Sequence, residues 1–204
     1  DVGVAMGARG ATASSEAADV VLTTDRLDRL VEAIQIAQCC RAIAGQSVLV
    51  HGAAGVVGSM ATQLARDAGA YVIGTGRAAG RQTALDFGAQ EFVDLDNDAL
   101  EDVGGVDLVF DVLGGDIAKR SAGVIRAGGT LVTIAGPTEA RPSGGLTIDF
   151  VVVPDRAQLS ELVQRVRDGR LRTNIGNVAA LDDAVAAFNP TERIKGKTII
   201  RVRP

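Results

Sequence analysis

The sequence is short of the residues that build aromatic cores, disulfides and zinc sites. Aromatic residues make up 3% of the 204 residues, and tryptophan is absent. The core must therefore be built from valine, leucine, isoleucine and alanine. The two cysteines, Cys39 and Cys40, are adjacent, and His51 is the single histidine. Because a zinc site needs three or four suitable ligands, we predict no metal site.

The sequence also lacks a block of basic residues and a long apolar run. The formal net charge is -4, which argues against nucleic acid or an anionic membrane as a partner. No apolar run reaches the length of a membrane span, and no signal-peptide pattern opens the chain. Nothing in the cysteine usage indicates an oxidising compartment. We therefore expect a cytoplasmic protein.

Short apolar runs alternate with amphipathic stretches along the chain, which is typical of a doubly wound α/β fold with a parallel sheet. We expect a turn at Gly128-Gly129, an exposed loop over 137–147 and an apolar run over 150–153. Asp155, with Gln158 three residues later, resembles a cap for the helix that follows. The expected strands are 47–50, 71–75, 91–94, 106–112, 130–135 and 198–202. The expected helices are 55–68, 81–87, 116–125, 181–188 and one after Asp155 with the apolar stripe Leu159, Leu162, Val163 and Val166.

A glycine-rich loop joins the first of these strands to the first helix, as His51-Gly52-Ala53-Ala54-Gly55-Val56-Val57-Gly58. A pyrophosphate is bound by backbone N–H groups at a helix N-terminus, with no side chain in its way. Gly52 permits a tight turn, Gly55 lets the phosphate approach, and Gly58 lets the helix pack closely on the strand. Such a loop can also serve packing alone. The surrounding strands and helix favour a dinucleotide site.

The end of the second strand predicts which dinucleotide is bound. NAD-specific sites place Asp or Glu about 20 residues past the glycine loop, to bind the ribose hydroxyls. Here the sequence reads Gly74-Thr75-Gly76-Arg77, with Arg81 following, and contains no carboxylate. Arginine binds a 2′-phosphate as a fork, so the pattern favours NADP. Alternatively, the two arginines are solvated charges at the start of a helix.

Several segments together resemble the zinc-independent quinone oxidoreductase branch of the medium-chain dehydrogenases. The resemblance covers about residues 45–204 and implies a Rossmann-type domain that binds NADPH and transfers hydride to a quinone or enone. The segments that carry it are VLVHGAAGVVG, YVIGTGR, LDFGAQEFVD, VDLVFDVLGG, GGTLVTIAGP, DFVVVPDRAQL and GKTIIRV.

The resemblance also implies roles for individual residues. The pyrophosphate would lie on Ala54, Gly55, Val56, Val57 and Gly58. The 2′-phosphate would lie near Thr75, Gly76, Arg77 and Arg81. The riboses and nicotinamide would be lined by Val112, Leu113, Gly114, Ile134, Ala135, Gly136, Phe150 and Val151. A tyrosine that often follows the third strand in this branch is replaced by Leu95. No catalytic acid or base is predicted, so hydride transfer would rest on positioning of the reactants.

Residues 1–44 resemble something else, the end of the phosphorylation domain of a heavy-metal P-type ATPase. The similar stretch is DVGVAMGARGATASSEAADVVLTTDRLDRLVEAIQIAQ, which contains neither DKTGT nor GDGxND. We expect strands at 2–6 and 20–23 and a helix at 27–37, a small α/β add-on with a structural role. The predicted domains are therefore 1–44 and 45–204.

The resemblance further implies a GroES-like substrate domain, for which this chain contains no matching segment. Two functions stay open: the NADPH-binding part of a quinone oxidoreductase, or a non-catalytic nucleotide-binding or interaction module. His51 either contacts substrate or has a structural role, and the structural role is the more usual one at a strand end. An unpartnered last strand, 198–202, would favour a homodimer.

Overall fold

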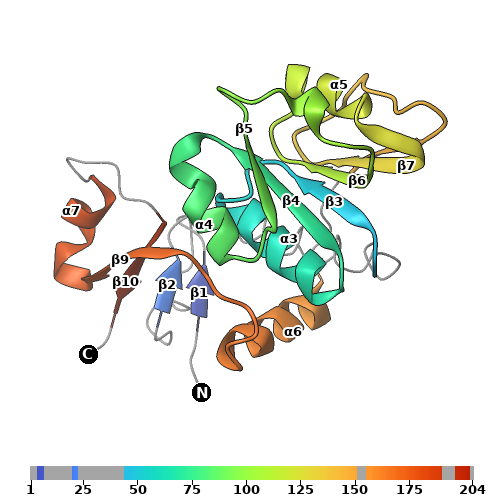
Figure 1. Ribbon diagram of the computed structural model, residues 1–204. Helices are drawn as coiled ribbons and strands as arrows, with labels where there is room; N and C mark the ends of the chain where they lie inside the picture. The colour runs from blue at the N-terminus through green and yellow to red at the C-terminus, as the bar shows by residue number, and fades with distance from the viewer. Residues whose placement is uncertain (1–3, 7–19, 23–43, 151–154, 190–195, 203–204) are drawn as a thin grey trace. The chain divides into compact units, whose positions relative to one another are not determined.

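The computed structural model describes residues 4–6, 20–22, 44–150, 155–189 and 196–202 (Figure 1). The chain divides into two compact units, which we describe separately. The larger unit spans residues 29–172, and the smaller unit combines residues 1–28 with 173–204. This grouping by contacts places residues 173–204 with the amino-terminal segment. The division into 1–44 and 45–204, which concerns the origin of the segments, stays a prediction.

The larger unit is built on a parallel sheet, as the alternating sequence predicts. Its strands lie in the order β5, β4, β3, β6, β7, β8, and every neighbouring pair is parallel. The chain thus starts in the middle of the sheet, winds outward to one edge, and returns to wind outward to the other. The order of winding reverses between β3 and β6, which is where ligands of such sheets bind. The strand bounds are β3 (Ser47–Val50), β4 (Tyr71–Gly76), β5 (Glu91–Asp94), β6 (Val106–Asp111), β7 (Ile125–Thr133) and β8 (Leu146–Asp149).

Helices cover both faces of this sheet, because the strands alternate two apolar faces. On β3, Val48 and Val50 pack with α3 (Val56–Asp67) and α4 (Arg81–Asp86). Leu49 between them faces the opposite cluster, which includes α5 (Gly115–Ala122) and the short η3 (Leu100–Asp102). The predicted doubly wound α/β fold is confirmed, with a core mainly of aliphatic side chains that also buries Phe92 and Phe110.

One further helix, α6 (Arg156–Arg167), packs on the outside of α3. Asp155 caps it as predicted, accepting hydrogen bonds from the backbone N–H groups of Ala157 and Gln158. Of the expected apolar stripe, Leu162 is buried against Met60 and Leu64, whereas Val163 and Val166 are exposed. The prediction is therefore wrong for Val163 and Val166, because the buried strip along α6 is narrow.

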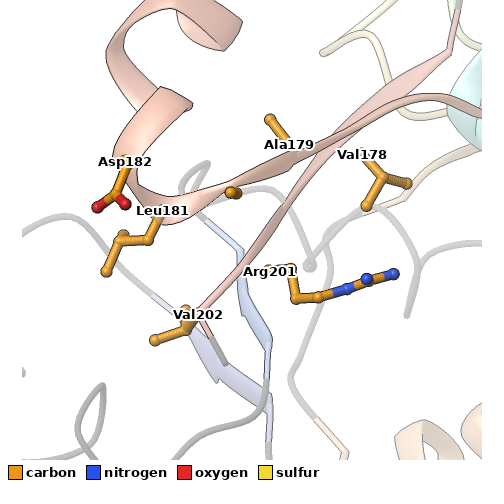
Figure 2. A pocket seen from close by; sticks show the side chains of 7 residues that line it. Val178, Ala179, Leu181, Asp182, Arg201 and Val202 are labelled. Carbon is orange, nitrogen blue, oxygen red and sulfur yellow. The ribbon is translucent and has the colours of Figure 1, made fainter. Parts of the chain in front are cut away.

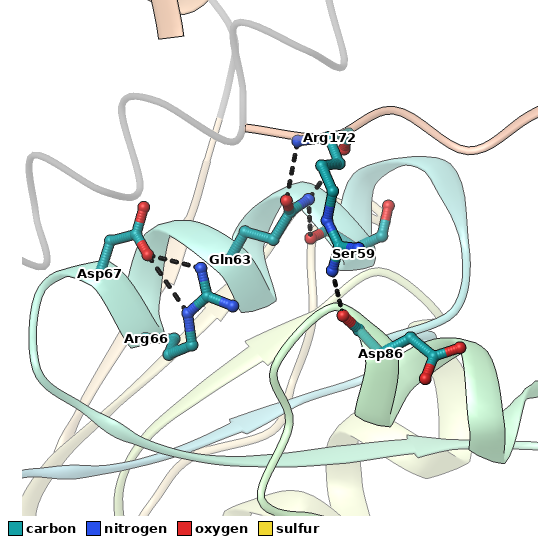
Figure 3. Close-up of polar contacts among 6 residues, drawn as sticks. All are labelled: Ser59, Gln63, Arg66, Asp67, Asp86 and Arg172. Carbon is teal, nitrogen blue, oxygen red and sulfur yellow. Dashed lines mark hydrogen bonds and ion pairs between the residues drawn. The ribbon is translucent and has the colours of Figure 1, made fainter. Parts of the chain in front are cut away.

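The segment after α6 is fastened to α3 and α4 by polar contacts (Figure 3). The buried Gln63 side chain accepts from the N–H of Arg172 at 2.8 Å and donates to its carbonyl at 2.9 Å. The Arg172 guanidinium lies over the Phe87 ring and donates to the carbonyl of Asp86. These contacts hold α3 in place from the side opposite the sheet.

Three element predictions are wrong around β7 and β8. The helix expected over 116–125 ends at Ala122, because Val124 and Ile125 are buried in the core and Ile125 already pairs with Val106. The turn expected at Gly128-Gly129 lies inside β7. A Cβ on Gly129 would lie 2.7 Å from the carbonyl oxygen of Asp107, so this glycine serves close strand packing. Part of the expected loop 137–147 forms the start of β8.

The smaller unit contains a mixed sheet in the order β1 (Val4–Met6), β2 (Val20–Leu22), β10 (Lys197–Arg201), β9 (Ile175–Ala180). β2 and β10 are antiparallel, and the other two pairs are parallel. β9 was not predicted, and the helix expected over 181–188 is split into η4 (Leu181–Asp183) and α7 (Ala184–Phe188). The expected helix 27–37 lies outside the described residues. Within the described ranges, no helix is both long and apolar enough to cross a membrane.

Candidate functional site

The glycine loop lies at the reversal point of the larger sheet and is held by close backbone packing. Gly52 has φ +62°, a conformation that a side chain rarely adopts, and its carbonyl accepts from the N–H of Gly55 at 2.7 Å. A Cβ on Gly58 would lie 2.1 Å from the Gly52 carbonyl oxygen. Only a glycine therefore lets α3 begin this close to the end of β3.

The first turn of α3 leaves its backbone donors unused. The N-cap is Gly55, which has no side chain to accept from them, and the first turn carries no acidic residue. Within the described part of the chain, the N–H groups of Val56, Val57 and Gly58 have no acceptor. Gly55 and Val56 are exposed, the latter at 40%. An exposed, uncapped N-terminus of a twelve-residue helix favours an anion.

The loop after β4 lies against this glycine loop and carries the two arginines. A Cβ on Gly80 would lie 2.9 Å from the Cβ of Ala54, so the two loops are in contact. The Arg77 side chain is 83% exposed, and its Nε lies 3.9 Å from a carboxylate oxygen of Asp96. Arg81 instead donates to the carbonyl of Phe92 and lies over that ring at 5.1 Å. The Arg77 side chain is thus the more exposed of the two, whereas Arg81 is held by its contacts with Phe92.

The loops after β6 and β7 complete the same edge of the sheet. A Cβ on Gly52 would lie 3.0 Å from Val112 Cγ2, and one on Gly114 would lie 2.9 Å from the Cβ of Ala135. Val112 therefore lies against the glycine loop, and Ala135 lies against Gly114 in the loop after β6. Phe150 is held by a hydrogen bond from its N–H to the carbonyl of Thr133. Val151 lies outside the described residues.

Asp111 shapes the loop after β6 and is fully buried. Its carboxylate accepts from the N–H of Leu113 at 2.9 Å, from the N–H of Gly114 at 3.0 Å, and from the Thr133 hydroxyl at 2.8 Å. These bonds fix the backbone of the loop. With its oxygens so engaged, Asp111 positions the loop.

His51 joins three elements behind the glycine loop. Its Nε2 lies 2.6 Å from the Ser121 hydroxyl, and its Nδ1 lies 2.7 Å from the Thr75 hydroxyl. Ser121 donates its proton to the carbonyl of Ile117, so we assign the imidazole as donating from Nε2 and accepting at Nδ1. Burial lowers the pKa of His51 to about 4, although the nearby Asp111 carboxylate opposes this. The imidazole is neutral at pH 7 and supports the loop.

The acidic turn after β5 was missed by the sequence analysis. Asp94 is buried and accepts from the Asn97 side chain and from the N–H of Asp96, and these bonds lower the pKa of Asp94. The repeated Asp/Asn residues over 94–98 are typical of such turns and could have indicated it. The turn brings Asp96 beside Arg77, so the candidate site includes a carboxylate.

Two further observations concern metal binding and the smaller unit. Within the described ranges, no group of three or more His, Cys, Asp and Glu side chains gathers that could hold a metal ion. An open groove of about 420 Å³ lies in the smaller unit (Figure 2). It is bordered by β9, η4 and the end of β10, with Asp182 and Arg201 among its lining residues. None of the predicted cofactor residues lines it.

Known proteins share both the sequence and the fold. A family model described as zinc-binding dehydrogenase matches residues 56–164, more than half of the chain. Rat (Rattus norvegicus) quinone oxidoreductase is 34% identical over 178 residues, covering 77% of this chain and 54% of the rat protein.

Two solved structures extend this likeness to the fold. The Thermus thermophilus quinone oxidoreductase, solved also in complex with NADPH, has a TM-score of 0.66 at 27% identity, covering 84% of this chain and 62% of that one. A zinc-binding dehydrogenase from Sinorhizobium meliloti 1021, bound to NADP, has a TM-score of 0.72 at 25% identity, covering 85% and 57%. The chain spans about half the length of the first relatives it matches. It belongs to the zinc-binding dehydrogenase family of the medium-chain dehydrogenases.

Proposed function

We propose that this chain is the NADP-binding part of a quinone-oxidoreductase-like enzyme. The observation that carries the proposal is the uncapped start of α3, held against β3 by a glycine that no larger residue can replace. Relatives described as quinone oxidoreductases, and neighbours solved with NADPH or NADP, support it. Transfer of hydride to a quinone or enone is the activity proposed for the whole enzyme.

The residues present fit such a cofactor. The free N–H groups of Val56, Val57 and Gly58 would hold the pyrophosphate, with Ala54 and Gly55 leaving room for it. Gly76 and Arg77 would border the adenosine ribose, and Arg77 would bind the 2′-phosphate as a fork. Thr75, also predicted there, is fully buried with its hydroxyl on His51, so it would support the site from behind. The loops at 112–114 and 134–136 would line the nicotinamide side, together with Phe150.

Bound NADPH would supply the hydride, and this chain's residues would orient it. Asp111 fixes the loop after β6 through two backbone N–H groups, and neutral His51 ties β3 to β4 and α5. A buried imidazole with a pKa of about 4 does not donate a proton at pH 7. We therefore assign both residues to positioning and name no acid or base.

A titration tests the proposal directly. NADPH and NADH are added to the purified chain, and binding is followed by calorimetry and by nicotinamide fluorescence. Binding of NADPH at micromolar concentration, at least tenfold tighter than NADH, is the expected result. Absence of binding of either coenzyme at millimolar concentration would rule the proposal out, and a preference for NADH would overturn the NADP assignment alone. Oxidation of NADPH by an added simple quinone would then show whether this chain is active by itself.

A second candidate function, a non-catalytic interaction module that forms a homodimer, is favoured by the surface of the smaller unit. Its large exposed apolar side chains are Ile175, Val178, Leu181, Val185 and Phe188, of which Val178 and Leu181 line the groove of Figure 2. A unit that exposes several large apolar side chains is suited to contact with a partner. The expected result is a dimer mass by light scattering that V185E converts to a monomer mass. A monomer at all concentrations, or robust NADPH-dependent quinone reduction, would argue against this candidate.

For residues 1–44 we propose a structural role, whatever their origin. Support comes from β2, whose Val21 pairs with Ile200 of β10. The matching family model starts at residue 56, and the relatives reported above give the P-type ATPase resemblance no support.

A further inference from the structure

Two opposite charges face each other where β4 and β5 end. The Arg77 Nε lies 3.9 Å from Asp96 Oδ2, and the two side chains are 83% and 64% exposed. β4 and β5 are parallel neighbours, so their carboxyl ends meet at one edge of the sheet. Asp96 therefore stands beside the arginine to which the 2′-phosphate is assigned.

This juxtaposition is built by Asp94, the last residue of β5. Its carboxylate accepts from the N–H of Asp96 on one side and faces the N–H of Ala78, next to Arg77, on the other. The same turn is closed by bonds from the N–H groups of Asn97 and Asp98 to the Asp94 carbonyl. The buried Asp94 thus fixes the backbone at Asp96 and next to Arg77, the two charged residues.

The neighbouring acid, Asp98, has a different partner. Its carboxylate accepts from the N–H of Asp94 at 2.8 Å and lies 3.6 Å from the Arg81 guanidinium. Arg81 is held by Phe92, so Asp98 belongs to the internal bonding of the turn. Asp96 alone of these two acids pairs with the exposed arginine.

We propose that Asp96 is a specificity-determining residue that lowers the preference for NADPH over NADH. This inference rests on the proposed function. Its carboxylate competes with the 2′-phosphate for Arg77, and it repels that phosphate across a short distance. NADH carries no 2′-phosphate, so neither effect acts on it. With the Asp96 carboxylate present, the site therefore prefers NADPH over NADH less strongly than it would with Arg77 alone.

The substitution D96N removes the charge and keeps the size of the side chain. At about 50 mM salt, we expect NADPH to bind roughly threefold to tenfold more tightly, the range for a weak exposed ion pair plus a repulsion. NADH affinity should stay within about twofold. The matched control is D98N, in the same turn but paired with Arg81, which should change NADPH affinity by less than about twofold.

A double-mutant cycle with R77Q shows whether the effect passes through Arg77. In the R77Q background, the gain from D96N should fall below about twofold. A gain that persists there, an equal gain for NADH, or no gain in D96N would each overturn the inference. If the unsubstituted protein binds neither coenzyme, the proposed function fails and takes this inference with it. If it binds NADPH but does not respond to D96N, only this inference fails.

Discussion

The two halves of the candidate site are built in opposite ways. Around α3, the site rests on close backbone packing of Gly58 against Gly52, with the buried, hydrogen-bonded side chains of His51 and Asp111 behind them. Beyond β4, it consists of exposed charges, Arg77 and Asp96, about 4 Å apart. The first half is held by close steric packing, so an atom added at Gly58 would displace α3 or the loop. The second half is held by weak electrostatic interactions. Its side chains can therefore be substituted with little loss of stability, and they can set which coenzyme is preferred.

The sharpest test of the steric half is G58A. An added Cβ would lie 2.1 Å from a backbone oxygen, so either α3 or the loop must move. We expect a loss of about 3 kcal/mol or more in the free energy of unfolding, and loss of coenzyme binding. The control is G104A, where a Cβ meets nothing within 4 Å and stability should change by less than about 0.5 kcal/mol. Urea unfolding measures both, and a stable G58A that binds NADPH normally would contradict this account.

His51 makes the stability of the steric half depend on pH. Burial lowers its pKa from 6.5 to about 4, so between these values the unfolded chain binds the proton and the folded chain does not. The contribution of neutral His51 to the free energy of unfolding is full above about pH 6.5, and it is lost as the pH falls toward 4. From pH 7 to pH 5 the loss is about 2 kcal/mol. In H51Q this part of the pH dependence should vanish, as measured by urea unfolding at each pH. Equal slopes in the two proteins would refute the assignment.

In the charged half, R77Q and R81Q should differ. R77Q removes the exposed guanidinium, and we expect about tenfold weaker NADPH binding with unchanged NADH binding and unchanged stability. R81Q removes the bond to the Phe92 carbonyl, so it should lower stability by about 1 kcal/mol and change NADPH affinity by less than about threefold. Calorimetric titration and thermal unfolding separate the two effects. The reverse pattern would mean that Arg81 is the phosphate ligand.

Salt should act on the charged half alone, and this is the smallest effect. Raising ionic strength from about 0.05 M to 0.5 M shortens the screening length to a few ångströms. We expect the preference for NADPH over NADH to fall by about twofold to threefold, with the melting temperature nearly constant. If the preference for NADPH over NADH does not change with salt, buried contacts and not the exposed charges distinguish the two coenzymes.

Much of the fold could be predicted, because the strongest signals are local. The glycines at 52, 55 and 58 fix the β3–α3 turn, and the strands at 47–50 and 91–94 have the expected bounds. The errors fall where tertiary contacts override local preference. Nothing in the sequence around Gly129 indicates that it lies against the Asp107 carbonyl, inside β7 where a turn was expected. The partner of Arg77 was missed for the same reason, since Asp96 reaches it only through strand pairing.

The contacts between the loops of this site run through positions that have no side chain. Gly58 allows the close approach of Gly52, Gly80 allows that of Ala54, and Gly114 allows that of Ala135. An alanine scan removes atoms, and at a glycine there are none to remove. Mutational surveys that only truncate side chains would therefore miss these loop contacts. Substitutions that enlarge residues, made one at a time, are the ones that would outline it.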